Sequence, residues 1–362
     1  MKKTAIKIFK KIILIILCLF LGIIGIALSV RAVGKLYYSM TPKGGINQSF
    51  YVDINGSKQW ISIYGKDINN PVLLSLHGGP GSSASIGEYY LMRSWADKYT
   101  IVTWDQRNCG KSYSKDQVGT VKYTYDLFME DGRQMTEFLR EYLGKDKITL
   151  FGHSWGTYFG ANLALTYPEL YDCYIGAGQF IDLHENEKMF VETAKEWVKG
   201  DPEGEALLAK YDSKNINDDW FKAKEMIMRR YGYATSSVKP EYNMFATIFF
   251  NPHYSLLDIY RYFDGEMHLK YGGKDYSDFT ASPEFEKFSL LGKQDYKIPY
   301  YNINGDKDYQ TNFILAKQYF DGVNAPRKKF FLMKDMTHIL HEARPKEVSK
   351  IIHEIAELEG NK

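Results

Sequence analysis

The chain has 362 residues, 44% of them hydrophobic and 25% charged, which is enough material for one large buried core. Its formal net charge of +2 is unevenly distributed: residues 1–31 hold six of the 46 Lys and Arg and none of the 44 Asp and Glu, so the remainder carries −4. This balance excludes the basic surface that a nucleic-acid-binding protein needs, and three cysteines are too few for a disulfide framework.

The N-terminus combines a cluster of lysines with a long uncharged run. Five lysines precede residues 12–30, which contain no charged side chain and would span about 28 Å as a helix. Lysines on this side place the N-terminus in the cytoplasm and the rest of the chain outside the cell. We therefore predict a single-pass membrane anchor at residues 1–31. The alternative is a signal peptide cleaved near Ala27-Leu28-Ser29, in which case residues 1–29 are removed and the protein is secreted.

After a polar linker over residues 32–49, strands and helices take turns. Residues 50–54 and 60–64 alternate apolar and polar side chains around Asn55-Gly56, which predicts a β-hairpin. Because the later strands are continuous apolar runs separated by helices, they predict a mostly parallel sheet covered by helices on both faces. The predicted strands are residues 72–76, 100–104, 147–151, 171–177, 298–303 and 328–333, and the predicted helices are 85–97, 125–143, 157–167, 312–320 and 345–358.

The alternation is interrupted between residues 181 and 296. This segment lacks strand-length apolar runs, is rich in aromatic residues and shows helical spacing over residues 187–199 and 218–230. We therefore predict an α/β core built from residues 50–180 and 297–362, with residues 181–296 inserted as a helical lid.

A G-x-S-x-G motif lies where a predicted strand meets a predicted helix. Gly152-His153-Ser154-Trp155-Gly156 follows the strand at 147–151 directly. At such a nucleophile elbow the turn is so tight that the serine is strained with its Oγ exposed, and the flanking glycines supply the space. The motif predicts an α/β-hydrolase fold with Ser154 as the nucleophile.

A serine nucleophile needs a general base and an acid that orients the base. In α/β-hydrolases these follow in the order Ser, acid, His, each in a loop after a strand. His338 lies in the loop after the last predicted strand and is the predicted base, with His341 as the nearby alternative. Asp308 follows the strand at 298–303 and is the predicted acid, and Asp306 in the same loop remains open.

A glycine-rich loop, His77-Gly78-Gly79-Pro80-Gly81, follows the strand at 72–76 directly. Glycines at this place allow a backbone N–H to reach a substrate oxygen, so we predict an oxyanion hole formed by the N–H groups of Gly79 and Trp155. The sequence contains no G-x-x-x-x-G-K-[ST] and no G-x-G-x-x-G after a strand. We predict neither a cofactor nor a metal ion.

Three motifs taken together resemble the proline iminopeptidase family of α/β-hydrolases: the Leu76–Gly81 loop, the stretch W-D-Q-R-N-C-G-K-S over residues 104–112, and Gly152–Gly156. The resemblance covers residues 50–180 well and residues 298–358 in pattern. It implies a serine mechanism that uses Ser154, Asp308 and His338.

The resemblance also implies that Asp105 and Arg107 support the H-G-G-P-G loop without taking part in the chemistry. The chain departs from the family where Asn108 replaces a glycine and where His153 stands in place of the usual glycine.

In the aminopeptidases that the chain resembles, lid glutamates hold the N-terminal ammonium of the substrate. Glu185 and Glu187 occupy a matching place, although acids are also common in the first turn of a helix. The tryptophan-rich W-x-W-E stretch of that family is missing. We predict a serine hydrolase that releases the N-terminal residue of short peptides or acts on related small molecules. The alternatives are an esterase or lactonase of the same fold, and a membrane-tethered binding protein without catalysis.

Overall fold

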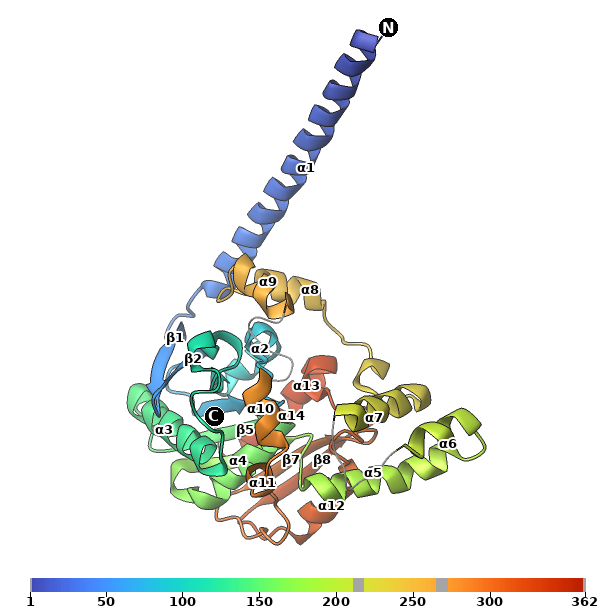
Figure 1. Cartoon of the computed structure of the whole chain (residues 1–362). Helices are drawn as coiled ribbons and strands as arrows, with labels where there is room; N and C mark the ends of the chain where they lie inside the picture. The colour runs from blue at the N-terminus through green and yellow to red at the C-terminus, as the bar shows by residue number, and fades with distance from the viewer. Residues whose placement is uncertain (1, 211–217, 265–272, 361–362) are drawn as a thin grey trace.

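The computed structural model describes residues 2–210, 218–264 and 273–360, and Figure 1 shows their arrangement. Its centre is an eight-stranded sheet in the order β1-β2-β4-β3-β5-β6-β7-β8. β1 pairs antiparallel with β2, and β2 antiparallel with β4, whereas the remaining neighbours are parallel. The predicted mostly parallel sheet is confirmed. The strands are β1 (Ile46–Ile54), β2 (Ser57–Gly65), β3 (Val72–Leu76), β4 (Thr100–Asp105), β5 (Ile148–His153), β6 (Tyr171–Ala177), β7 (Tyr300–Gly305) and β8 (Lys328–Met333).

Different helices cover the two faces of this sheet, because neighbouring residues of a strand point to opposite sides. On one face, Leu74, Leu150 and Tyr300 pack against α3 (Tyr125–Leu143), α4 (Trp155–Thr166) and α12 (Phe313–Gly322). On the other face, Leu73, Phe151 and Tyr301 pack against α14 (Pro345–Leu358) and a 3₁₀ turn at Arg93–Asp97. Both faces of the sheet are therefore covered by helices and shielded from solvent, as is usual for parallel strands.

Among the described residues, the segment between β6 and β7 is helical. Its helices are α5 (Leu183–Val198), α6 (Pro202–Leu208), α7 (Asp218–Tyr231), α8 (Met244–Phe250), α9 (Leu256–Asp264), α10 (Gly273–Thr280) and α11 (Pro283–Glu286). α5 and α7 share a small core of their own around Phe190 and Ile227. The last part of the segment behaves differently, since Phe279, Phe285 and Phe288 join the main core around Trp155. Residues 181–296 are thus not a separate layer along their whole length.

Several elements begin or end a few residues from their predicted bounds, and two regions differ from the sequence-based expectation by more than that. The predicted helix at 85–97 is divided into α2 (Ser85–Leu91) and the 3₁₀ turn at Arg93–Asp97. Residues 32–39, expected as linker, continue helix α1 (Lys2–Ser39), and β1 begins at Ile46. The helix continues because no proline interrupts it before Pro42, and because its end packs on the folded body.

Helix α1 extends away from the rest of the molecule (Figure 1). Within the described residues it is the one helix long and apolar enough to cross a bilayer, with a mean hydropathy of 3.1 in its most apolar window and no part of that window buried. These properties fit a membrane anchor and equally a signal sequence.

Candidate active site

Ser154 lies in the sharp turn between β5 and α4. Its backbone has φ 55° and ψ −122°, a left-handed conformation that costs free energy for a residue with a Cβ. The turn depends on Gly156, because a Cβ there would lie 1.9 Å from the carbonyl oxygen of Leu76 on the neighbouring strand. The N–H of Ser154 donates a hydrogen bond to the Ala177 carbonyl at 3.1 Å, which ties the turn to the end of β6. The geometry is that of a nucleophile elbow.

His338 and Asp308 come from the loops after β8 and β7 and meet in the interior. His338 Nδ1 lies 2.9 Å from Asp308 Oδ2, and both side chains are buried. The other carboxylate oxygen, Oδ1, accepts the N–H groups of Gln310 and Thr311, each at 3.0 Å. Asp306 instead accepts the N–H of Met336 and does not face the imidazole. Asp308 is therefore the carboxylate that can orient His338.

A single turn, Ala177-Gly178, touches both the serine turn and the Asp308–His338 pair. Ser154 is bonded to Ala177, and a Cβ on Gly178 would lie 3.1 Å from His338 Nδ1 and 3.3 Å from Asp308 Oδ2. All these positions follow the carboxyl ends of strands β5 to β8, the edge of a parallel sheet where α/β proteins place their sites.

The H-G-G-P-G loop closes the site on the other side of Ser154. A Cβ on Gly78 would lie 3.2 Å from the Cβ of Ser154, so the loop backbone passes directly beside the serine. Gly79 has φ 119°, and a Cβ there would lie 2.6 Å from the N atoms of Gly81 and Ser82, so no other residue fits. Within the described chain, the N–H groups of Gly79 and Trp155 donate no hydrogen bond. Both donors are available to a substrate oxygen.

Asp105 and Gln106 form hydrogen bonds with the H-G-G-P-G loop and with residues that follow it. Asp105 accepts Ser83 Oγ at 2.5 Å and the N–H of Lys111 at 2.8 Å, and its complete burial raises the pKa of the carboxyl to about 6. Gln106 accepts the Trp155 indole N–H at 3.0 Å and donates to the His77 carbonyl at 3.2 Å. Gln106 thereby joins the two segments that carry the candidate oxyanion donors. The motif over residues 104–112 contains Gln106 but does not reveal this connecting role.

Among the described residues, no hydrogen bond joins the Arg107 side chain to the H-G-G-P-G loop, contrary to the expectation from the resemblance. Its guanidinium forms a two-pronged bond with Asp131 of α3, at 2.7 Å for both N–O pairs, and donates to the Asn55 carbonyl at 2.9 Å. The pair is almost fully buried. Arg107 therefore joins α3 to the β1–β2 hairpin, a structural connection that lies apart from the candidate donors.

Arg107→Ala is expected to lower the free energy of unfolding by about 3–5 kcal/mol, because it leaves the Asp131 carboxylate buried without its counter-charge. Denaturant unfolding of the full chain in detergent, followed by circular dichroism, measures this change. Arg229→Ala is the matched control: its 2.8 Å pair with Glu225 is exposed and should contribute about 0.5 kcal/mol at most. Equal losses in the two variants would contradict the interpretation.

Of the two glutamates considered for substrate binding, Glu185 lies at the surface of the first turn of α5, with Lys188 as its partner at 3.1 Å. Glu187 is buried, and both of its carboxylate oxygens lie 2.9 Å from Lys224 Nζ. Asn186 donates to the same carboxylate at 2.7 Å. The charge of Glu187 is therefore already compensated by the chain's own ammonium group, a pairing that the sequence did not reveal.

The Glu187–Lys224 pair lies next to the loop that carries Asp308. Lys224 Nζ donates to the Gln310 carbonyl at 3.2 Å, and Asn186 donates to the same carbonyl at 3.0 Å. Asn186 also accepts the N–H of Asn312 at 2.7 Å. Helices α5 and α7 are thus bonded to the acid loop as well as to each other.

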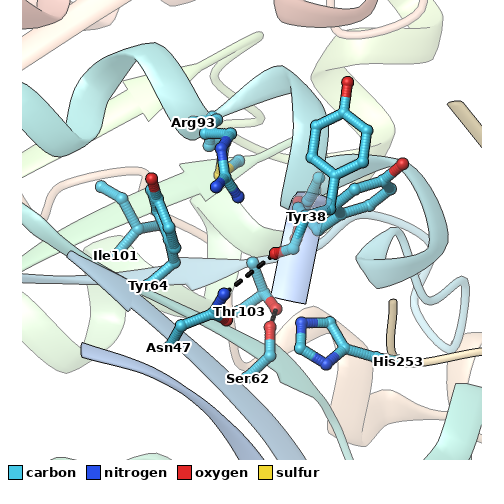
Figure 2. Close-up of a pocket in the computed structure, with 11 residues that line it drawn as sticks. Tyr38, Asn47, Ser62, Tyr64, Arg93, Ile101, Thr103 and His253 are labelled. Carbon is cyan, nitrogen blue, oxygen red and sulfur yellow. Dashed lines mark hydrogen bonds between the residues drawn. The ribbon is translucent and has the colours of Figure 1, made fainter. Parts of the chain in front are cut away.

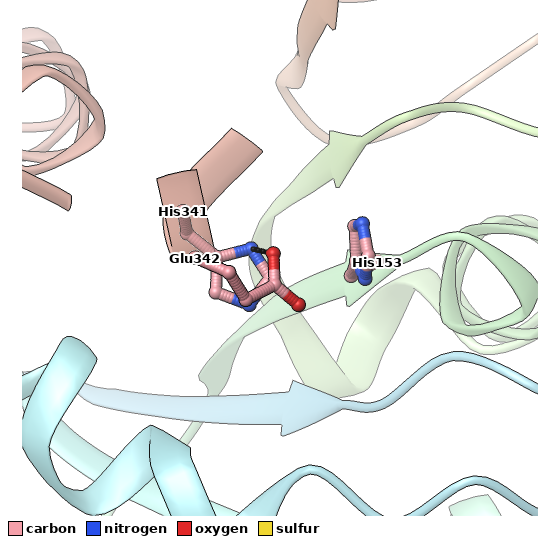
Figure 3. Close-up of side chains that lie close together, drawn as sticks. All are labelled: His153, His341 and Glu342. Carbon is pink, nitrogen blue, oxygen red and sulfur yellow. Dashed lines mark ion pairs between the residues drawn. The ribbon is translucent and has the colours of Figure 1, made fainter. Parts of the chain in front are cut away.

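His153, His341 and Glu342 lie close together, the two histidines buried and the glutamate half-buried (Figure 3). The centre of the His153 ring lies 4.9 Å from that of His338. His153 Nε2 lies 3.0 Å from the His338 carbonyl, so this nitrogen carries the proton, and burial lowers the pKa of His153 to about 4. The candidate ligand atoms of the three residues lie within 4.8 Å of one another. Two ligands of one tetrahedral zinc ion are about 3.4 Å apart, so the group would have to contract to hold the metal. We interpret it as the support of the loop that carries His338.

Comparisons with known proteins bear on the fold and on the family resemblance. Residues 71–215 match the family described as alpha/beta hydrolase fold. The chain is 26% identical over 309 residues to "Probable aminopeptidase YbaC" of Bacillus subtilis, covering 81% of this chain and 91% of that protein. It is 34% identical over 137 residues to a proline iminopeptidase of Saccharolobus solfataricus, covering 37% of this chain and 42% of that protein.

Solved structures show the same fold. The proline iminopeptidase of Mycobacterium smegmatis superposes with a TM-score of 0.59 at 17% identity, covering 86% of this chain and 98% of that one. The epoxide hydrolase VrEH1 of Vigna radiata superposes with a TM-score of 0.54 at 19% identity, covering 86% and 98%. The predicted α/β-hydrolase fold and the predicted resemblance to proline iminopeptidases are confirmed.

Proposed function

We propose that this chain, which has the α/β-hydrolase fold, is a serine hydrolase that works through an acyl-enzyme. The observations that support the proposal are the strained turn at Ser154, whose N–H is bonded to Ala177, and the buried Asp308–His338 pair, which lies against the next residue, Gly178. Fold alone does not define activity, so the proposal depends on these observations.

In the proposed mechanism, Ser154 Oγ attacks the substrate carbonyl while His338 Nε2 takes its proton. Asp308 accepts the hydrogen bond from His338 Nδ1–H and so holds the tautomer in which Nε2 is free to act as a base. The N–H groups of Gly79 and Trp155 would stabilise the negative oxygen of the tetrahedral intermediate, at roughly 3 kcal/mol for each donor. His338 then gives the proton to the leaving group. Water, activated by the same imidazole, releases the acyl group and restores Ser154.

For the substrate, we propose the N-terminal residue of short peptides. The similarity to "Probable aminopeptidase YbaC" supports this choice because it extends over 81% of the chain and includes the inserted segment.

One observation favours a second candidate, an esterase or lactonase. An aminopeptidase needs a carboxylate to bind the free ammonium of its substrate, but Glu187 is already paired with Lys224 and Glu185 lies at the surface. A neutral ester needs no such group. The two candidates share the Ser154 mechanism and differ only in what holds the substrate.

A panel of chromogenic substrates separates the candidates. We expect the protein to hydrolyse prolyl or alanyl anilides with a free α-amine, and to lose this activity when the amine is acetylated, because acetylation removes the charge that is recognised. Steady-state rates of the full chain in detergent give the comparison, with Ser154→Ala as the blank. Faster hydrolysis of p-nitrophenyl esters or lactones, with no discrimination against acetylated amines, would contradict the aminopeptidase and support the esterase.

We also propose that α1 remains attached as a membrane anchor, with the hydrolase outside the cell. Five lysines precede its uncharged run, and the helix continues without a break from that run to the folded body.

A further inference from the structure

Residues 31–35, near the C-terminal end of α1, pack against the helical segment 244–264. The guanidinium of Arg31 is buried and donates to the carbonyls of Phe249 and Tyr254, the second at 2.7 Å. Gly34 packs against Phe250 of α8, since a Cβ on Gly34 would lie only 2.2 Å from the Phe250 ring. Lys35 Nζ donates to the Tyr254 carbonyl at 3.1 Å. Helix α8 and the turn after it are therefore fixed beside residues 31–35 of α1.

The last turn of α1 is held against the sheet as well (Figure 2). The Tyr38 carbonyl accepts Asn47 Nδ2 of β1 at 2.9 Å. The guanidinium of Arg93 lies 5.3 Å from the centre of the Tyr38 ring and 3.9 Å from that of Tyr64. Because residues 31–35 contact α8 and the turn after it, and Tyr38 contacts Asn47 and Arg93, α1 has a defined position relative to the rest of the protein.

Helices α8 and α9 are also firmly bonded to the segment that follows the H-G-G-P-G loop. Tyr254 Oη lies 2.7 Å from Ser85 Oγ, and Asn251 donates to the Ile86 carbonyl at 2.9 Å. Tyr89 Oη donates to the Thr247 carbonyl at 2.6 Å. On α9, Tyr262 Oη donates to the Ser83 carbonyl at 3.3 Å. These contacts fix which sides of α8 and α9 face the body and which face away from it.

The sides that face away are apolar. Phe245 of α8 is 83% exposed, although a phenylalanine at the surface of a soluble protein is usually largely covered. On α9, Leu256, Leu257 and Phe263 are exposed by 49% to 61%. In Figure 1 both helices lie across the foot of α1, between the long helix and the rest of the molecule. An apolar surface of this kind marks a contact with a partner or a membrane.

We propose that α8 and α9 lie in the surface of the same bilayer that α1 crosses, so that the hydrolase has a second, in-plane membrane contact. The proposal rests on the anchoring of α1. Arg31 directly follows the uncharged run of residues 12–30, so its depth is that of the boundary between acyl chains and headgroups. Because Arg31 is bonded to α8 and to the turn before α9, these helices share that depth.

The side chains fit such a position. Helices that lie in the plane of a membrane bury a few apolar and aromatic residues at the headgroup level. Phe245, Leu257 and Phe263 are residues of this type. The bilayer is favoured over a protein partner because Arg31, at the end of the uncharged run, is bonded directly to α8 and to the turn before α9, which carry this surface.

Site-directed spin labelling of the full chain in phosphatidylcholine–phosphatidylglycerol vesicles tests the proposal. A nitroxide at Phe245→Cys or Leu257→Cys, in a Cys18→Ser background, is expected to collide with oxygen several-fold more often than with a water-soluble nickel complex. The two other native cysteines are buried and should not react. Leu332→Cys, at an exposed position of β8, is the aqueous control, and a label on native Cys18 reports the span itself.

The outcomes are distinguishable. If the labels at 245 and 257 behave like the label at 332 while the label on Cys18 is in the bilayer, the in-plane contact is wrong and the anchor stands. If the label on Cys18 is also aqueous, the anchor and the in-plane contact are both wrong, whereas the hydrolase chemistry of Ser154 is untouched.

Discussion

Ser154→Ala is expected to abolish hydrolysis and to abolish covalent labelling by a fluorophosphonate probe. Removing the nucleophile of a serine triad lowers kcat by roughly 10⁶-fold, because the remaining groups cannot form the acyl-enzyme. The fold should survive the change. Alanine replaces a side chain for which no hydrogen bond is found among the described residues, and the strained turn keeps both of its glycines.

Gel fluorescence of the labelled full chain and steady-state kinetics measure the two effects. Ser94→Ala, which removes an exposed hydroxyl on the 3₁₀ turn at Arg93–Asp97, is the matched control and should label and turn over at the normal rate. Undiminished labelling of Ser154→Ala would show that another residue is the nucleophile.

The parts of the fold that the sequence predicted well are those whose signals are local. β6, β8, α3 and α14 have the predicted bounds. Helix α3 shows why: Thr124 caps its start by accepting the N–H of Leu127 at 3.2 Å, and Gly144 ends it in a left-handed conformation. Helix α1 was predicted too short because its end is stabilised by tertiary contacts, among them the packing of Gly34 on Phe250, which no local pattern announces.

The same distinction holds for the site. The sharp turn at Ser154 and the pairing of Asp308 with His338 could be predicted from their order along the chain and their places after strands, because the fold brings strand ends together. The partners of the supporting residues could not. Lys224 neutralises Glu187 across 37 positions of sequence. No spacing rule relates two lid helices whose packing depends on their whole apolar faces.

Arg107 illustrates the opposite error. Its motif suggested support of the oxyanion loop, whereas the structure pairs it with Asp131 and gives the connecting role to Gln106. Neighbouring residues of an irregular loop point in different directions, so a motif identifies the loop without assigning its individual side chains.

Asp308→Asn is expected to lower kcat by about 10⁴-fold with little change in KM, because the amide would hold the wrong histidine tautomer. The two oxygens of Asp308 have different partners. Oδ1 accepts two backbone N–H groups, from Gln310 and Thr311, so the amide oxygen of asparagine must take this position. The NH₂ group then replaces Oδ2 and points a donor at His338 Nδ1. His338 would then adopt the tautomer with an unprotonated Nδ1 and a protonated Nε2. In this tautomer Nε2 could no longer accept the proton of Ser154.

Asp306→Asn is the matched control, since it changes the other aspartate of the same loop, whose carboxylate accepts only the N–H of Met336 at 3.3 Å among the described residues. We expect kcat to change less than about tenfold in this variant, a loss of no more than about 1.4 kcal/mol in transition-state stabilisation. Thermal unfolding of both variants checks that the loop remains folded. A large loss of kcat in Asp306→Asn together with a normal rate in Asp308→Asn would show that Asp308 is not the acid. The tautomer argument, on which the proposed role of His338 as the base depends, would then be wrong as well.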